Sequence, residues 1–179
     1  MKKILFLIIA IFMLFYSYKS SVKSETIIPD EAIRFRVIAN SNTIYDQNIK
    51  IRLKNVIQNK IFEITSNSNT IEDTRKKIKE NMNIIDNLVK ETLKELNYDM
   101  NYNIKYGYNY FPKKVYRGVE YNEGNYESLV ITLGEGNGDN WWCVLFPPLC
   151  LVEADETNVT NAEYTFFIKE IIDKYKAVK

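Results

Sequence analysis

The sequence predicts an α+β protein, a mostly antiparallel sheet with helices packed on it, after an N-terminal signal or anchor segment. Three observations predict this fold. Residues 33–39 alternate between two faces as a β-strand does, two helical stretches follow, and the second half is rich in tyrosine and short alternating segments. A strand, two helices, several strands and a final helix is an order typical of α+β domains. With 179 residues, 46% of them hydrophobic, we expect residues 25–179 to form a single exported domain.

Residues 1–24 indicate export from the cell. A lysine pair at 2–3 precedes an unbroken apolar run at 4–16, after which the chain turns polar. These thirteen apolar residues are fewer than the ~20 that span a bilayer, and they match the apolar region of a signal peptide. The one tolerable cleavage triplet, at 22–24, lies well past the run. The segment is therefore either a cleaved signal peptide or an uncleaved membrane anchor.

Three stretches have helical periodicity. From Asp46, one face carries Ile49, Leu53, Val56, Ile57, Ile61 and Ile64. Thr70 caps a second helix, whose stripe is Ile71, Ile78, Met82, Ile85, Val89 and Leu96. The near-heptad spacing of this stripe allows a coiled-coil partner, but fewer than four heptads favours packing against the sheet. A last helix at 162–176 is expected to bury Tyr164, Phe167, Ile168, Ile171 and Tyr175.

Residues 102–108, 127–133 and 140–146 read as strands, and the last two are joined by a glycine-rich loop at 134–139. A dinucleotide fingerprint needs G-x-G-x-x-G followed by a helix. Here the third glycine comes one position early and two tryptophans follow. The loop is therefore expected to be a hairpin connection, with 140–146 as the returning strand, and not a nucleotide site.

Composition and charge disfavour several classes of function. The chain carries 24 basic and 23 acidic residues, and without residues 1–24 its net charge is −3, so a nucleic-acid binder is not expected. Histidine is absent, which removes Ser-His and Cys-His catalysis and His-ligated metals. The acids Glu153, Asp155 and Glu156 read as a solvated loop and not as a catalytic pair. We therefore expect no catalytic residues, no cofactor and no metal.

Residues 140–150, NWWCVLFPPLC, are the most unusual stretch. On a strand, Trp141, Cys143 and Leu145 share one face, and Trp142, Val144 and Phe146 share the other. Both faces are apolar, so this is either a central strand covered on both sides or a strand with one face exposed for a partner. The candidate partner-binding residues are Trp142, Trp141, Phe146, Pro147 and Pro148.

The two cysteines of the chain, Cys143 and Cys150, flank a Pro-Pro turn. Without histidine they cannot complete a tetrahedral zinc site in one chain. In an exported protein they suggest a disulfide, and the alternative is two reduced thiols. Because Cys143 shares a face with Trp141, we expect Trp141 to be the core residue and Trp142 the contact residue.

Over residues 31–152 the chain resembles the stage II sporulation protein R family. The resemblance rests on the run at 140–150, together with Ile33-Arg34, Val37 to Ser41, Asp46-Gln47, Phe111-Pro112, Lys114, Tyr116, Gly118, Gly134, Gly136 and Gly138. It implies a protein made in the forespore and exported into the intermembrane space of the sporulation septum. There it would trigger a membrane-embedded aspartic protease, which processes pro-sigma factor E in the mother cell. The resemblance implies no catalytic residue and no cofactor.

Two other classes compete with this interpretation. One is an exported cell-envelope enzyme, such as a cell-wall hydrolase that uses Asp or Glu. The other is a purely structural envelope protein.

Overall fold

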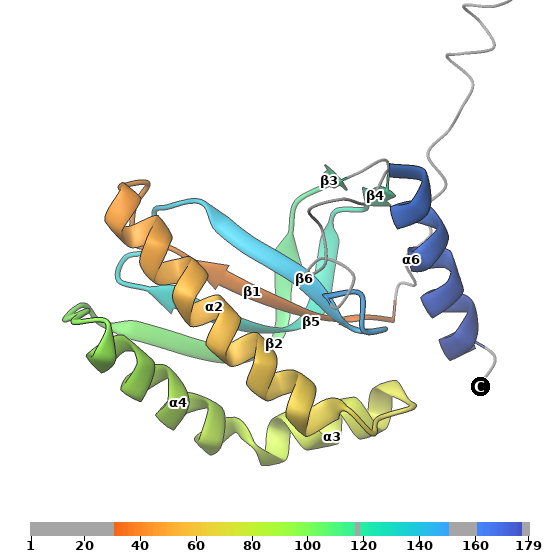
Figure 1. Ribbon diagram of the computed structural model, residues 1–179, viewed down its shortest axis with the longest axis horizontal. Helices are drawn as coiled ribbons and strands as arrows, with labels where there is room; N and C mark the ends of the chain where they lie inside the picture. Colours follow the sequence, from red (N-terminus) through yellow and green to blue (C-terminus); the bar gives the residue numbers. More distant parts are fainter. Residues whose placement is uncertain (1–30, 117–118, 151–160, 177–179) are drawn as a thin grey trace, which may run out of the picture.

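The computed structural model describes residues 31–116, 119–150 and 161–176, and it confirms an α+β fold (Figure 1). In chain order the elements are β1 (Ile33–Ile38), α2 (Ile44–Thr65), α3 (Ile71–Glu80), α4 (Met82–Glu95), β2 (Tyr102–Phe111), β3 (Lys114–Tyr116), β4 (Val119–Tyr121), β5 (Gly124–Leu133), β6 (Asn140–Phe146) and α6 (Asn161–Lys176). None of these helices is long and apolar enough to cross a membrane. The export segment, residues 1–24, lies outside the described residues.

Four strands form one mixed sheet in the order β2-β5-β1-β6. β1 runs parallel to β5 and antiparallel to β6, while β2 and β5 are antiparallel along their whole length. The prediction that β6 returns alongside β5 was wrong, because β1 lies between the two strands. Strand pairing depends on contacts that are distant in sequence, and local alternation does not specify them.

The glycine-rich loop is therefore a crossover past the end of β1 and not a hairpin. The backbone of the loop lies against the residues that directly follow β1. The amide of Gly138 donates to the Ala39 carbonyl at 2.9 Å, and the amide of Asn137 donates to the Asn40 carbonyl at 3.0 Å. A Cβ on Gly138 would collide with the carbonyl of Ser41. The glycine here serves close backbone approach.

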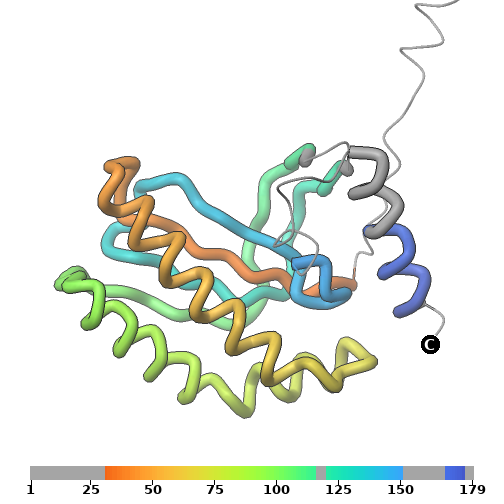
Figure 2. Tube along the Cα trace, in the orientation of Figure 1, coloured from red at the N-terminus to blue at the C-terminus, as the bar shows by residue number. Residues whose placement is uncertain are grey.

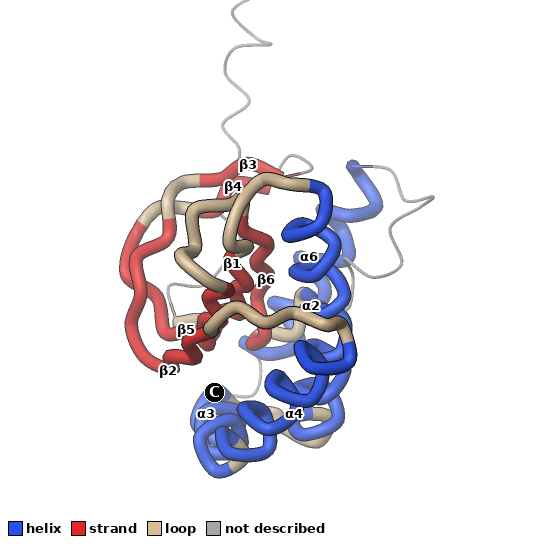
Figure 3. The backbone as a smooth tube through the Cα atoms, turned by 90° about the vertical axis from the view of Figure 1, so that its left-hand side faces the viewer, coloured by secondary structure: helices blue, strands red, loops and turns tan. Residues whose placement is uncertain are grey.

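Helices α2, α3 and α4 cover one face of the sheet, as the side view shows (Figure 3). The main core lies between these layers and contains Ile33, Phe35, Val37, Ile49, Leu53, Ile57, Ile61, Ile78, Ile85, Val89, Leu129 and Ile131. The predicted second helix is interrupted at Asn81, which separates α3 from α4. The Asn81 side chain donates to the Lys77 carbonyl at 2.8 Å, a local bond that competes with helix continuation. The apolar stripe of the predicted helix continues from α3 into α4 and faces the sheet.

A second core forms on the opposite face of the sheet. The C-terminal half of β2 and the N-terminal half of β5, which pair with each other, bend away from the rest of the sheet. They lead toward the short β3–β4 pair, as the chain trace shows (Figure 2). With α6 they enclose Ala32, Phe111, Tyr121, Tyr126, Trp142, Val144, Leu149, Ile168 and Ile172. Of the residues predicted to be buried on the last helix, Ile168 is buried and Ile171 and Tyr175 are partly buried. The side chains of Tyr164 and Phe167 lie outside those described.

Candidate partner-binding site

The candidate stretch forms β6, an edge strand of the sheet. Its side chains alternate as predicted: Cys143 and Leu145 join the main core, whereas Trp142 and Val144 join the second core. Phe146 is the exception, because it packs with the main core. The sequence left open whether this strand is covered on both faces or has one face exposed for a partner. In the structure both faces of β6 are covered, although β6 is an edge strand and not a central one.

Trp142 is deeply buried, with 6% of its surface exposed. Its ring meets Tyr121 edge-on at 5.1 Å between centroids and Phe111 at 5.4 Å. Aromatic pairs in this geometry add stability beyond their buried area. Trp142 was expected to be the contact residue of the pair and not the core residue. Its burial differs from that expectation, because Phe111 at the end of β2 and Tyr121 of β4 cover its face of the sheet.

Arg34 lies at the centre of the same aromatic group. Its guanidinium carbon is 3.3 Å from the ring centre of Tyr126, 4.8 Å from that of Trp142 and 5.0 Å from that of Phe111. Only 1% of this side chain is exposed, and burial lowers the pKa of Arg34 to about 10, an effect that the nearby Tyr126 hydroxyl partly offsets. Arg34 therefore stays cationic at neutral pH, held chiefly by cation–π contacts.

Sequence reasoning missed this arrangement. The alternation of β1 places Arg34 on the face opposite the main core, where an arginine is ordinarily solvated. The sequence did contain a signal for it. Residues 106–126 are rich in aromatic residues, and with Trp142 they could form a second apolar layer that buries the side chains on this face of β1.

Trp141 lies on the helix-facing side of β6 and is only partly buried. Its ring meets Phe35 edge-on at 5.8 Å, and the ammonium of Lys54 lies 4.4 Å from its centre. Of the two indoles, Trp141 is the one that reaches solvent. The structure thus reverses the burial expected for the pair.

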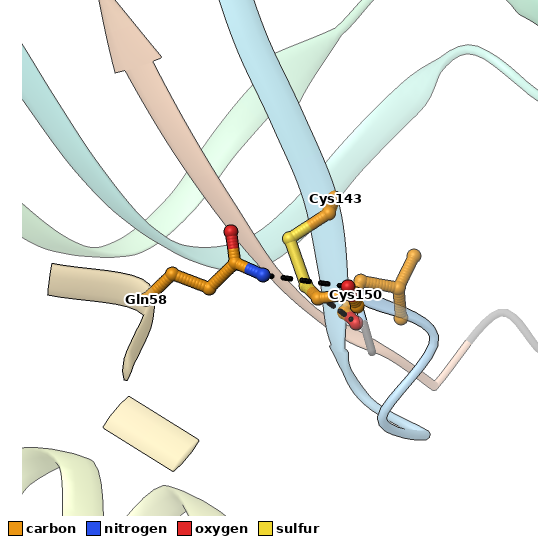
Figure 4. Close-up of a disulfide and its surroundings, with 4 residues drawn as sticks. Gln58, Cys143 and Cys150 are labelled. Atoms are coloured by element: carbon orange, nitrogen blue, oxygen red, sulfur yellow. Dashed lines mark hydrogen bonds between the residues drawn. A yellow bond between two sulfur atoms is a disulfide. The ribbon is translucent and has the colours of Figure 1, made fainter. Parts of the chain in front are cut away.

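The turn after β6 is tied back to the sheet. Cys143 and Cys150 are joined by a disulfide with their Cα atoms 5.3 Å apart, and the Phe146–Pro147 peptide bond is cis. The Gln58 side chain of α2 donates to the Cys150 carbonyl at 3.3 Å (Figure 4). The disulfide ties the turn to β6, and the Gln58 hydrogen bond joins the turn to α2.

Two of the five candidates meet at a pocket beside this turn. Phe146 and Pro148 line a hollow of about 260 Å³, and Tyr175 of α6 closes it with its ring 5.1 Å from that of Phe146. The other walls are Phe62, Thr65, Ser66, Ser68, Thr74 and Leu145. Pro147 is buried. The structure therefore gathers Phe146 and Pro148 at one place, while Trp141 and Trp142 lie on opposite faces.

A polar network joins the β1–α2 turn, the start of α2 and the glycine-rich loop. The carboxylate of Asp46 accepts from the amide of Asn40 at 3.0 Å and from the hydroxyl of Ser41. The hydroxyl of Ser41, and after it the amide of Asn40, hold the pKa of Asp46 below its ordinary value. Gln47 donates to the Ser41 carbonyl at 3.0 Å, and Lys50 donates to the Asp139 carbonyl at 3.0 Å. The network fastens the β1–α2 turn to the glycine-rich loop.

A second polar group joins α3 to the sheet. Arg75 donates twice to Glu127, with bonds of 2.8 Å each from Nε and Nη2 to the two oxygens. The hydroxyl of Tyr106 donates to the same carboxylate at 2.8 Å, and burial raises the pKa of Tyr106. Every member has a partner, so the group is suited to holding α3 in place. Among the described residues, no cluster of three or more acids or cysteines has the arrangement of a metal site.

Comparison with known proteins places these motifs in a family. The model of the stage II sporulation protein R family matches residues 29–156, which include both β1 and β6. The chain belongs to this family. It is 36% identical over 135 residues to stage II sporulation protein R of Bacillus subtilis (strain 168). That match covers 75% of the chain and 60% of the relative, so the chain spans about 60% of the length of that protein. No solved structure matches the chain.

Proposed function

We propose that this sporulation protein is an intercellular signal that acts by binding and not by catalysis. In this proposal it is made in the forespore and exported into the space between the two septal membranes. There it activates a membrane-embedded aspartic protease, which then processes pro-sigma factor E in the mother cell. Residues 1–24 supply the export signal or, if uncleaved, a membrane anchor.

Family membership over residues 29–156 is the observation that carries the proposal. The geometry of the body agrees with a binding role. Its most distinctive stretch builds a disulfide-tied edge strand and the apolar rim of a pocket, formed by Phe146 and Pro148. Apolar pockets beside partly exposed aromatic side chains are typical of protein interfaces.

The proposal is tested in a sporulating strain that lacks the corresponding gene. Forespore expression of the full chain should restore sigma-E activity in the mother cell. A chain without residues 2–24 should not, although it accumulates to the same level. Full sigma-E activity in the strain without any copy of the gene would contradict the proposal.

A peptidoglycan zymogram separates this function from a cell-wall hydrolase. The signalling proposal predicts no clearing by the purified protein at concentrations at which a known hydrolase gives a band. A clearing zone that is lost on substitution of an acidic residue would favour the enzyme instead.

A further inference from the structure

β2 forms the other edge of the sheet, and no described strand pairs with its outer side. It is ten residues long and free of proline, and it bends along its length (Figure 2), with a positive φ at Gly107. Exposed strand edges of this length present a row of backbone donors and acceptors that can pair with another chain. Natural proteins usually shorten, twist, cover or charge such edges. β2 is long, no described strand covers it and its one charged residue is Lys105, which makes it a candidate interaction surface.

The register shows which backbone groups point outward. Residues of β2 and β5 pair regularly from Tyr102↔Leu133 to Phe111↔Gly124, and one step before this ladder the Gly134 amide donates to the Asn101 carbonyl at 2.7 Å. In an antiparallel ladder, pairs that exchange hydrogen bonds alternate with pairs that do not. Odd-numbered residues of β2 therefore bond to β5, and even-numbered residues turn their N–H and C=O groups to the free edge. The carbonyl of Tyr110 already accepts from Arg36 at 3.3 Å, so the open part of the edge runs from 102 to 108.

The open part of the edge ends on a side chain that is unusually exposed for its type. Tyr108 is 71% exposed. Tyrosine is enriched at protein interfaces, because it combines a large apolar ring with a polar end. The edge thus has main-chain groups for pairing and one aromatic anchor, Tyr108.

Charge distinguishes between two occupants of the edge. Lys105 is exposed in the middle of the open part and is the one charged residue of β2, while the carboxylates of Asp86 and Glu127 accept hydrogen bonds from Tyr102 and Tyr106. A lysine at this position opposes antiparallel pairing with a second copy centred on it, since like charges would face each other. The same lysine favours an acidic side chain opposite it.

We propose that the β2 edge receives an extended, acidic segment of the partner protein by strand addition. Main-chain bonds to even-numbered residues supply the affinity, Lys105 pairs with a carboxylate of the added strand, and Tyr108 packs against it. The identity of the partner rests on the proposed function, whereas the outward-pointing main-chain groups follow from the register and from the lack of a described strand beside β2.

Hydrogen exchange of the purified full chain tests the edge itself. The amides of Ile104, Tyr106 and Tyr108 should exchange much faster than those of Asn103, Lys105 and Asn109. Equal protection of both sets would show that the edge is already occupied and would overturn the inference.

Crosslinking tests the partner. A benzophenone amino acid replaces Tyr108 in the full chain, which is co-expressed in a non-sporulating host with the membrane protease and its pro-sigma substrate. Irradiation should give a covalent adduct with the protease. The control places the same amino acid at Ile44, which is 83% exposed at the start of α2, and should give none. An adduct between two copies of the chain would overturn the inference in favour of self-pairing.

Charge reversal gives an independent readout. Lys105→Glu should reduce pro-sigma processing at least tenfold with an unchanged thermal midpoint, while Arg52→Glu, an equal change on the exposed side of α2, should leave processing unchanged. Normal processing by Lys105→Glu, with no adduct at position 108, would overturn the edge proposal and leave the proposed function standing. Absence of processing by the wild-type chain would overturn both.

Discussion

At the scale of single residues, the second core is organised around a charge. Arg34 is fully desolvated among Tyr126, Trp142 and Phe111, and its Nε and Nη1 atoms have no hydrogen-bond partner among the described residues. Arginine tolerates such a place better than lysine, because its planar, weakly hydrated guanidinium stacks on aromatic faces. Trp142 is thus part of a packing unit that includes the cation.

The tryptophan pair gives the first prediction. Trp142→Ala should lower the free energy of unfolding by about 3–5 kcal/mol, since it leaves a cavity in the second core and exposes Arg34 to an unfilled space. Trp141→Ala should cost clearly less, because that ring is only partly buried. Thermal and urea unfolding of the two purified variants measure the difference. Equal destabilisation, or a larger effect at Trp141, would contradict the assignment made from the structure.

Asp46 gives a prediction about pH. Its pKa lies below the ordinary value of 3.8, so the unfolded chain binds more protons than the folded one between the two pKa values. The stability that this carboxylate contributes is present above about pH 4 and is lost as pH falls through the folded pKa. Asp46→Asn should therefore lower the free energy of unfolding by about 1–3 kcal/mol at pH 7.

The gap between wild type and Asp46→Asn should narrow as the pH falls below 4, when urea unfolding is followed at several pH values. A gap that stays constant down to pH 2 would mean that hydrogen bonding by the ionised carboxylate does not stabilise the turn. Asp99→Asn, at an exposed position between α4 and β2, is the matched control.

At the scale of elements, local patterns predicted most helices and strands correctly, because periodicity follows which face of an element is buried. Two features were not predictable in this way. The break at Asn81 leaves the apolar stripe intact, so the stripe alone reads as one helix. The pairing of β6 with β1 depends on which strand occupies the centre of the sheet.

The candidate site shows the same division. Alternation along β6 correctly separated Cys143 and Leu145 from Trp142 and Val144. It could not show which face would be covered more fully, because the cover on Trp142 comes from Phe111 and Tyr121 on distant strands. For the same reason the burial of Arg34 was not foreseen.

The disulfide gives a prediction at the scale of the β6 turn. It closes a short loop, for which chain-entropy models give a stabilisation of about 2–3 kcal/mol. A variant with Cys143→Ser and Cys150→Ser should therefore lose about this much stability and retain partial signalling. Sigma-E reporter activity and the thermal midpoint are measured together. Complete loss of signalling by a variant that is still folded would point to a role of the thiols in signalling itself.

At the scale of the whole molecule, two cores lie on either side of one sheet, and both sheet edges are distinctive. The β6 edge is tied down by the disulfide and leads to the pocket at Phe146 and Pro148. No described strand pairs with the β2 edge over residues 102–108, and exposed Tyr108 lies at the end of this stretch. This arrangement, in a member of the stage II sporulation protein R family, is well suited to presenting surfaces to another protein.

We propose that the protein activates the membrane protease by binding to it. The most direct measurement is cleavage of pro-sigma factor E in a non-sporulating host that produces the membrane protease, with and without the full chain. We predict that mature sigma factor accumulates only when the chain and an active protease are both present. Cleavage that is independent of the chain, or no cleavage when chain, protease and substrate are all present, would contradict it.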